Sequence, residues 1–130
     1  LLPQHAVAET AFRITGRSEE EANQLHVDAN ALVKAGVFGI VMEGIIEPVA
    51  ASIAMGCKVP TIGIGASAAC DGQILVTEDV LGLYDAFTPK FVRKFANLQN
   101  DISAAAIGYR AAVIDGSFPT KDHLFWPKKP

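Results

Sequence analysis

Cysteine, clustered positive charge and long apolar runs are all scarce in this sequence, and each scarcity excludes a class of protein. Cys57 and Cys70, the two cysteines, are too few for a disulfide framework and lack the spacing of zinc ligands. The formal net charge is −3, and Lys and Arg form no cluster before the closing Lys128 and Lys129. We therefore expect neither a nucleic-acid partner nor a membrane partner.

No segment is long and apolar enough for a transmembrane helix, and none has the charged-then-apolar pattern of a secretion signal. These features predict a cytoplasmic location, or a mitochondrial one if the chain comes from a eukaryote. The chain starts at Leu1 rather than at a methionine. We therefore expect that a segment preceding Leu1 was cleaved or left out of the sequence.

The 130 residues are 50% hydrophobic, which is enough to build the core of one domain. An almost continuous apolar run covers residues 37–42 and stops at Glu43. A short apolar run of this kind is typical of a strand in a parallel sheet. Catalytic groups of α/β folds stand at the C-terminal edge of such strands, so Glu43 is a candidate catalytic residue. The local pattern fits a solvated turn residue equally well.

Local signals predict an alternation of helices and strands. Ser18 and Glu21 form a capping box that begins a helix, and Gly36 ends it. Glu47 and Pro48 begin a second helix. The remaining elements expected are strands at residues 37–42, 59–65 and 73–77, an irregular stretch at residues 78–88, and helices from Pro89 and from Asp101 to about Ile114. Residues 37–65 are therefore predicted to form a right-handed β-α-β unit with parallel strands.

Apolar spacing also predicts which residues of the C-terminal region are buried. We expect the last helix to bury one face, made of Ile102, Ala105, Ala106, Tyr109 and Val113. We expect the tail, with Phe118, Phe125 and Trp126, to pack along a surface. Three parallel strands would leave two apolar edges exposed, so the chain is expected to be part of something larger.

Residues 63–68 fit the loose dinucleotide-binding pattern G-x-G-x-x-A after a strand. The Asp71-Gly72 turn comes too soon for the required helix, and no acidic residue ends a strand about 20 residues later. We interpret Gly63 and Gly65 instead as a strand end that a ligand or a catalytic residue approaches closely.

Isolated carboxylates and histidines give weaker signals. Asp71 and Asp79 are candidate metal ligands, but a turn and a cap are about three times more common roles for such residues. His26 is expected at the surface of the first helix, whereas the roles of His5 and His123 stay open. No set of residues in this chain predicts a metal site.

Several motifs taken together carry a family resemblance: LLPQ, FRITGR, IVMEG, VPTIGIGA, DGQILVTED, LGL, PKFVRKF and FPTKDHLF. In order and spacing they resemble the C-terminal half of the ketopantoate hydroxymethyltransferases (3-methyl-2-oxobutanoate hydroxymethyltransferases). The resemblance covers essentially all 130 residues.

The resemblance implies an α/β fold, a (β/α)8 TIM barrel in which residues 1–130 supply about strands 6 to 8, their helices and a C-terminal tail. It implies hydroxymethyl transfer from 5,10-methylenetetrahydrofolate to 3-methyl-2-oxobutanoate, giving 2-dehydropantoate in pantothenate synthesis. Glu43 matches the general base of the family. The enolate would be held on Mg²⁺. In the family, the residues that bind this ion lie upstream of the position that matches Leu1. The implied partners are the 2-oxo acid substrate, the N-terminal half of the barrel and further copies in a homo-oligomer.

The sequence departs from the family at two matched positions. Ser67 stands where the family usually has glycine, and Leu124 replaces a polar residue. We take Gly63, Gly65 and Ser67 as candidate substrate-binding residues, with Ser67 able to reshape the pocket. We expect this chain alone to be inactive. Two alternatives stay open: a related magnesium-dependent 2-oxo acid lyase or mutase barrel, and a non-catalytic half-barrel.

Overall fold

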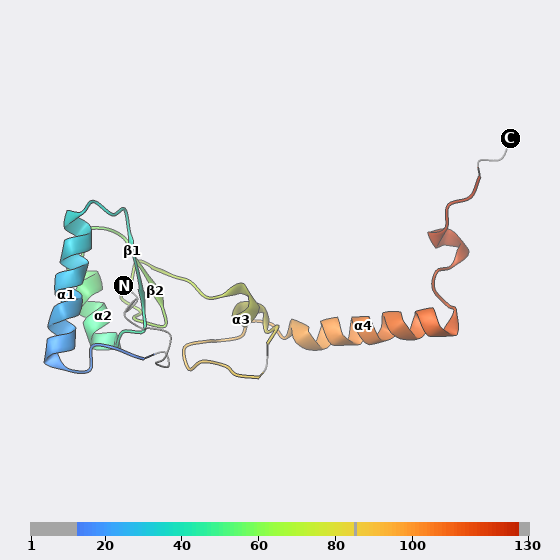
Figure 1. Cartoon of the computed structure of the whole chain (residues 1–130), viewed down its shortest axis with the longest axis horizontal. Helices are drawn as coiled ribbons and strands as arrows, with labels where there is room; N and C mark the ends of the chain where they lie inside the picture. The colour runs from blue at the N-terminus through green and yellow to red at the C-terminus, as the bar shows by residue number, and fades with distance from the viewer. Residues whose placement is uncertain (1–12, 85, 128–130) are drawn as a thin grey trace. The chain divides into compact units, whose positions relative to one another are not determined.

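A computed structural model describes residues 13–84 and 86–127 of the chain. These residues group into two compact units. The first unit contains residues 13–76 and 90–92, and the second contains residues 77–84, 86–89 and 93–127. Figure 1 shows their helices and strands along the chain.

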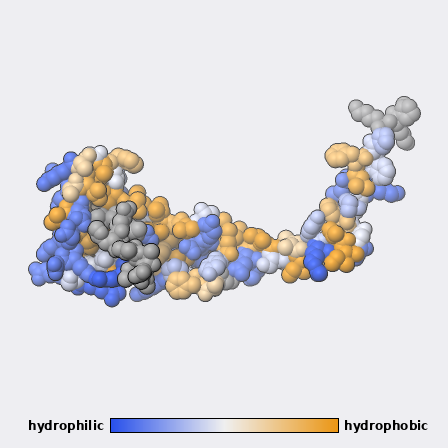
Figure 2. Space-filling model, in the orientation of Figure 1, coloured by the Kyte–Doolittle hydropathy of each residue, from blue (hydrophilic) through white to orange (hydrophobic). Residues whose placement is uncertain are grey.

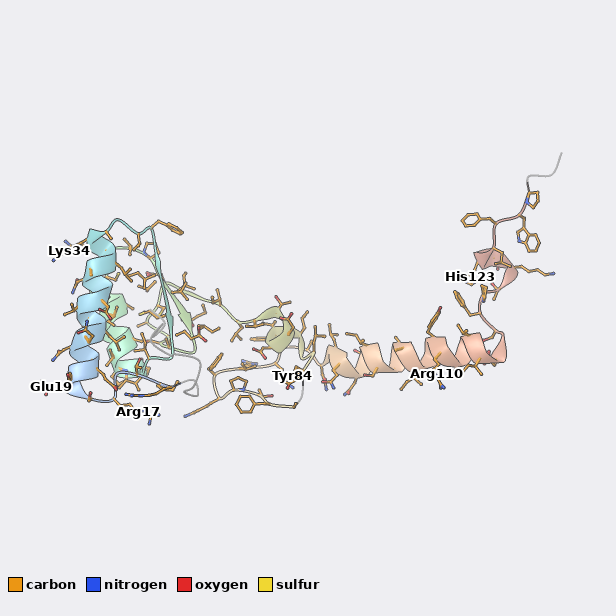
Figure 3. All side chains as sticks on the ribbon, viewed as in Figure 1. Arg17, Glu19, Lys34, Tyr84, Arg110 and His123 are labelled. Carbon is orange, nitrogen blue, oxygen red and sulfur yellow. The ribbon has the colours of Figure 1, made fainter. Side chains whose placement is uncertain are left out.

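Helix α1 (Glu19–Lys34) begins and ends where the sequence predicts. The Ser18 hydroxyl accepts a hydrogen bond from the Glu21 N–H at 3.2 Å, and the Glu21 carboxylate reaches back to accept from the N–H groups of Gly16 and Arg17. Arg13 forms an ion pair with the same carboxylate. Glu19 and Lys34 mark the two ends of the helix in Figure 3, where their charges oppose the partial charges of the helix ends.

Strand β1 (Ile40–Glu43) starts three residues later than predicted, because the preceding residues complete the end of α1. Gly36, at φ 85°, donates its N–H to Val33, and Val37 donates to the Leu32 carbonyl. This pair of bonds is a Schellman motif, which binds Val37 to the helix rather than to the sheet. Phe38, which the pattern placed inside the strand, is 96% exposed.

The predicted parallel β-α-β unit is confirmed. Helix α2 (Glu47–Gly56) follows β1, and strand β2 (Thr61–Ile64) then pairs parallel to β1 from Ile40↔Thr61 to Glu43↔Ile64. Pro48 lies in the first turn of α2, where its missing N–H costs no hydrogen bond. Figure 1 shows α1 and α2 lying together on one side of the strands.

The core of the first unit lies between the two helices and one face of the sheet. Ile40 and Met42 of β1 are buried, whereas Val41 between them is 47% exposed. Side chains alternate between the faces of a strand, so Ile40 and Met42 face the helices and Val41 and Glu43 face away. Burying a side chain of the size of Met42 contributes about 1.5–3 kcal/mol. The buried cluster comprises Leu25, Ala29, Ile40, Met42, Ile45, Val49, Ala50, Ile53 and Ala66. We call the opposite side the open face: there Val41 is exposed and Glu43 and Ile62 are half-buried, whereas Ile64 is 9% exposed.

Strand β3 (Gly72–Gln73) is much shorter than the predicted strand at residues 73–77. It pairs parallel to β2 through Ile62↔Gly72 and Gly63↔Gln73, which gives the sheet order β1-β2-β3. After Ile74 the chain leaves the sheet. Helix α3 (Thr77–Leu81) begins at the last residue of the predicted strand and covers the start of the predicted irregular stretch. Glu78 and Asp79 in its first turn favour this early helix start.

The helix predicted from Pro89 does not form, so that prediction is wrong. The N–H groups of Phe95 and Ala96 donate to the Val80 carbonyl instead of bonding within a helix. Helix α4 (Leu98–Asp115) starts three residues before the expected Asp101 and ends, as predicted, at Gly116, which has φ 75°. The 3-10 helix η1 (Lys121–His123) follows in the tail.

The apolar stripe of α4 is present, but the expectation that it is buried is wrong. The five residues of the stripe, Ile102, Ala105, Ala106, Tyr109 and Val113, are not buried, and Figure 2 shows apolar residues at the surface of this helix. Phe118 does pack against Tyr109, with ring centroids 5.7 Å apart, but Phe125 and Trp126 are exposed. None of the described helices combines the length and apolar composition needed to cross a membrane.

Asp71 fixes the start of β2 to the turn before β3. Its Oδ2 accepts hydrogen bonds from the Thr61 N–H at 2.8 Å and from the Thr61 hydroxyl at 2.9 Å. The Asp71 N–H returns a bond to the fully buried Thr61 hydroxyl. The bond from the Thr61 backbone, followed by that from its side chain, lowers the pKa of Asp71 below its ordinary value.

Gly65, directly after β2, lies beneath the Phe91 side chain. It has φ 61°, in the left-handed region, and a Cβ added here would stand 2.3 Å from the Phe91 Cβ. Both the backbone conformation and the packing of Phe91 therefore require glycine at this position.

We expect Gly65→Ala to destabilise the chain more than Gly36→Ala. Gly36 also has a positive φ, but nothing lies within 4 Å of its Cβ position, so alanine there adds only the left-handed backbone cost of about 1–2 kcal/mol. At Gly65 the collision with Phe91 adds to that cost. Urea unfolding of both variants measures the difference. Equal losses of unfolding free energy would show that the contact with Phe91 does not matter.

We expect the stability difference between the wild-type chain and Asp71→Asn to depend on pH. The folded-state pKa of Asp71 is lowered, so its contribution is complete above the unfolded value of about 3.9 and is lost as the pH falls through the folded value. Urea midpoints should differ by a constant amount from about pH 5 to 7 and converge below about pH 4. Thr61→Val, which keeps the backbone donor, should retain part of this pH dependence. A pH-independent difference would contradict the assignment.

Candidate functional site

Glu43 is the last residue of β1, at the C-terminal edge of the parallel sheet. Its backbone lies opposite Ile64, the last residue of β2, and its side chain is half-buried. The alternation along β1 places the carboxylate on the open face, together with Val41. A carboxylate here stands where α/β enzymes place their catalytic groups.

The chain after Glu43 is bound to Thr15, a residue that the sequence patterns did not single out. The Gly44 carbonyl accepts from the Thr15 N–H at 2.7 Å and from its hydroxyl at 3.1 Å, and Ile46 N–H donates to the Thr15 carbonyl. Thr15 thereby forms a parallel bridge with Ile45. In the sequence Thr15 appears only within the motif FRITGR, and its contact with Gly44 gives no local signal because the two residues are 29 positions apart.

Ser67 links the end of β2 to the first turn of α2. It is only 6% exposed, and its hydroxyl donates to Glu47 Oε1 at 3.1 Å while accepting from the Ala69 N–H at 3.0 Å. Its carbonyl accepts a bond from the Gln73 side chain at 2.8 Å. The residue at which the chain departs from the usual family motif therefore has defined partners within the chain.

The two candidate glycines make room for side chains of this chain. A Cβ on Gly63 would stand 2.9 Å from Gln73 Oε1 and 3.1 Å from Cys70 Sγ, and Gly65 lies beneath Phe91. Gly63 is buried, whereas Gly65 remains exposed. Because β1 and β2 are parallel neighbours, Gly65 and Ser67 follow β2 at the same edge of the sheet that carries Glu43.

The two candidate metal ligands lie in different units of the chain. Asp71 belongs to the first unit and is bound to Thr61, while Asp79 lies in α3 of the second unit. Within residues 13–84 and 86–127, no three His, Cys, Asp or Glu side chains are close enough to hold a metal ion.

Among the described residues, neither His26 nor His123 has a hydrogen bond to Glu43 or Ser67. His5 falls outside the described residues. His123 Nδ1 lies 2.7 Å from the Thr120 hydroxyl and accepts from the Thr120 N–H, which caps η1. His26 is half-buried on α1, rather than fully at the surface as predicted, and lines a pocket.

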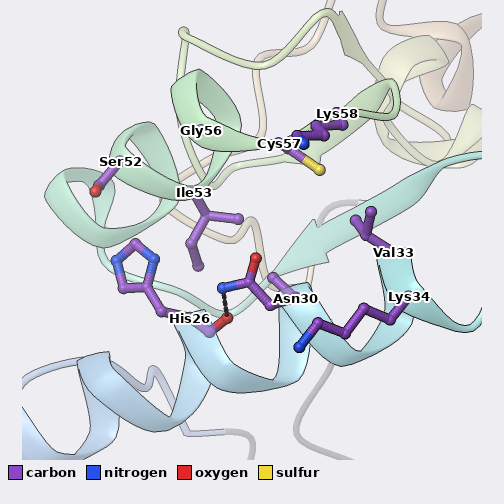
Figure 4. Close-up of a pocket in the computed structure, with 10 residues that line it drawn as sticks. His26, Asn30, Val33, Lys34, Ser52, Ile53, Gly56, Cys57 and Lys58 are labelled. Carbon is purple, nitrogen blue, oxygen red and sulfur yellow. Dashed lines mark hydrogen bonds between the residues drawn. The ribbon is translucent and has the colours of Figure 1, made fainter.

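This pocket, of about 250 Å³, lies between α1 and α2 and is drawn in Figure 4. Its lining includes Lys34 at the end of α1, together with Gly56 and Cys57 at the end of α2. Glu43 precedes the opposite, N-terminal end of α2. The pocket is therefore separate from the sheet edge that carries the carboxylate.

Comparison with known proteins identifies the family. The family described as ketopantoate hydroxymethyltransferase matches residues 1–121. Relatives named 3-methyl-2-oxobutanoate hydroxymethyltransferase include those of Paramagnetospirillum magneticum, 50% identical over 96% of this chain, and Brucella canis, 45% identical over 98%. The relative of Rhizobium rhizogenes is 46% identical over 99%.

The alignments cover nearly all of this chain but only 46–47% of each of these relatives, so the chain spans about half of their length. The match nevertheless includes the strand that ends at Glu43, the glycine-containing end of β2 and the turn at Asp71. With a match of this extent, the chain belongs to the ketopantoate hydroxymethyltransferase family.

Proposed function

We propose that the chain supplies the C-terminal half of a (β/α)8 barrel that transfers a hydroxymethyl group to 3-methyl-2-oxobutanoate, with Glu43 as the general base. The observation that carries the proposal is the position of Glu43, a half-buried carboxylate at the C-terminal edge of a parallel sheet. The family match over residues 1–121 supports the choice of reaction.

The proposed reaction starts with transfer of the C3 proton of the 2-oxo acid to the Glu43 carboxylate. The electrons of the C–H bond form an enolate. Water breaks both C–N bonds of the methylene bridge of 5,10-methylenetetrahydrofolate, which releases tetrahydrofolate and leaves the one-carbon unit as formaldehyde. C3 of the enolate forms a carbon–carbon bond to this carbonyl carbon, and the resulting alkoxide takes the proton back from Glu43, which gives 2-dehydropantoate. General base catalysis of this kind contributes about 10²–10⁴-fold to a rate.

The open face of the sheet supports a barrel completed by an N-terminal half. Val41 on this face is 47% exposed, and Ile62 beside it is half-buried. Parallel strands are normally covered on both faces. We propose that β1, β2 and β3 are the sixth, seventh and eighth strands of one barrel domain and that the segment at Thr15 pairs beyond β1. Typical barrels of about 250 residues are roughly twice as long as this chain.

The family resemblance also implies magnesium, and the described residues do not form a site for it. We propose that its ligands lie in the N-terminal half of the barrel. Of the candidate substrate-binding residues, Gly65 has an exposed backbone, whereas Gly63 and Ser67 are buried. We propose that a substrate contacts Gly65 directly and that Gly63 and Ser67 shape the pocket from behind.

The exposed stripe of α4 supports a homo-oligomer. The stripe contains the exposed residues Ile102, Tyr109 and Val113, and no residue of α4 is buried. Exposed apolar patches of this kind mark protein interaction sites. We propose that the stripe packs against another surface of the assembled enzyme.

In the complete barrel, Glu43→Gln should lower turnover by about 10²–10⁴-fold, because glutamine cannot accept the proton. Glu20→Gln, at an exposed acidic position in the first turn of α1, should leave turnover unchanged. Steady-state formation of 2-dehydropantoate measures both variants. Normal turnover by a folded Glu43→Gln enzyme would rule out the assigned base.

The complete barrel should form 2-dehydropantoate only when the one-carbon donor is present. The reason is that the added carbon comes from 5,10-methylenetetrahydrofolate. Product analysis by mass spectrometry with and without the donor distinguishes this transferase from a 2-oxo acid lyase or mutase. Conversion of the 2-oxo acid to another product without the donor would support the lyase or mutase instead.

A further inference from the structure

Hydrogen bonds from Thr15 and Ser67, two of them from side-chain hydroxyls, hold residues 44–47, which follow Glu43 and which we call the 44–47 segment. At its start, Gly44 accepts bonds from both the N–H and the hydroxyl of Thr15. At its end, Glu47 accepts a bond from the Ser67 hydroxyl at 3.1 Å. The two anchors come from chain positions on either side of the β1-α2 connection.

The segment needs such anchors because of Gly44. Its φ of 64° lies in the left-handed region. Glycine adopts this and many other backbone conformations at little cost. Without fixed partners on both sides, this glycine would allow the end of β1 to turn. The carboxylate of Glu43, one residue earlier, would then lose a defined direction.

The Ser67 hydroxyl donates and accepts its hydrogen bonds within this chain. Its single proton goes to Glu47, and it accepts from the Ala69 N–H, while the side chain is 6% exposed. It has no second proton to donate to a substrate. Thr15 likewise directs its hydroxyl to the Gly44 carbonyl.

We propose that Thr15 and Ser67 are positioning residues for Glu43. Their hydroxyls fix the two ends of the 44–47 segment and thereby aim the carboxylate at the C3 proton of the substrate. This inference rests on the proposed function of Glu43. It assigns roles in catalysis to two residues that do not touch the substrate.

The test uses Thr15→Val and Ser67→Ala in the complete barrel, with the N-terminal half supplied in the same chain or as a separate one. A displacement of about 1 Å at a reacting group costs up to about 10²-fold, so we expect kcat to fall by about ten- to a hundredfold in each variant. The KM for 3-methyl-2-oxobutanoate should change less than about twofold, because the base is not needed for binding.

A second readout is the exchange of the C3 proton with deuterated water, measured by NMR in the absence of the folate donor. The exchange rate should fall in parallel with kcat. Thr15→Ser, which keeps the hydroxyl, should restore both rates. Ser18→Ala is the matched control, since it also removes a hydroxyl bonded to a backbone N–H but acts at the start of α1. Rates are expressed per folded molecule, from the unfolding curve of each variant.

The outcomes separate the two proposals. If Glu43→Gln abolishes exchange while Thr15→Val and Ser67→Ala exchange at the wild-type rate per folded molecule, the positioning role alone is wrong. A rise in KM with unchanged kcat would make Ser67 a substrate ligand and would also overturn the role. If Glu43→Gln itself exchanges normally, the proposed function fails, and the positioning role fails with it.

Discussion

The parallel pairing of β1 with β2 is the interaction on which the rest of the first unit depends. Its register sets Ile40 and Met42 against the two helices and leaves Val41 and Glu43 on the open face. A shift by one residue would exchange the two sets and put a carboxylate into the apolar core. The same pairing brings the chain after β2 to the edge where Glu43 ends β1. One set of backbone hydrogen bonds therefore sets both the core and the position of the Glu43 backbone at the sheet edge.

The sequence predicted those features that local interactions determine. Ser18 and Gly36 mark the ends of α1 through bonds to residues a few positions away, Pro48 marks the start of α2 because it has no N–H to satisfy, and the structure confirms all three. The helix expected from Pro89 failed because Phe95 bonds to the distant Val80. The apolar stripe on α4 was predicted correctly as a pattern, but its predicted burial is wrong, because no residue of this helix is buried.

For the candidate site, the sequence could predict Glu43 because an apolar run that stops at an acid is a local signal. It could not predict the contacts that hold the following segment, since Thr15 lies 29 positions from Gly44 and Ser67 lies 20 positions from Glu47. Ser67 stood out only as a departure from the family motif, and the structure gives it partners. The chain belongs to the ketopantoate hydroxymethyltransferase family and spans about half the length of its matched relatives, and these two findings support the proposed reaction.

The central claim is that this chain completes a barrel and brings the base to it. The most direct measurement is formation of 2-dehydropantoate after mixing this chain with a separately produced N-terminal half, with the 2-oxo acid, the folate donor and magnesium present. We predict that the mixture is active and that each half alone is inactive. A stable, folded complex of the two halves without activity would contradict the claim, and so would full activity of the N-terminal half by itself.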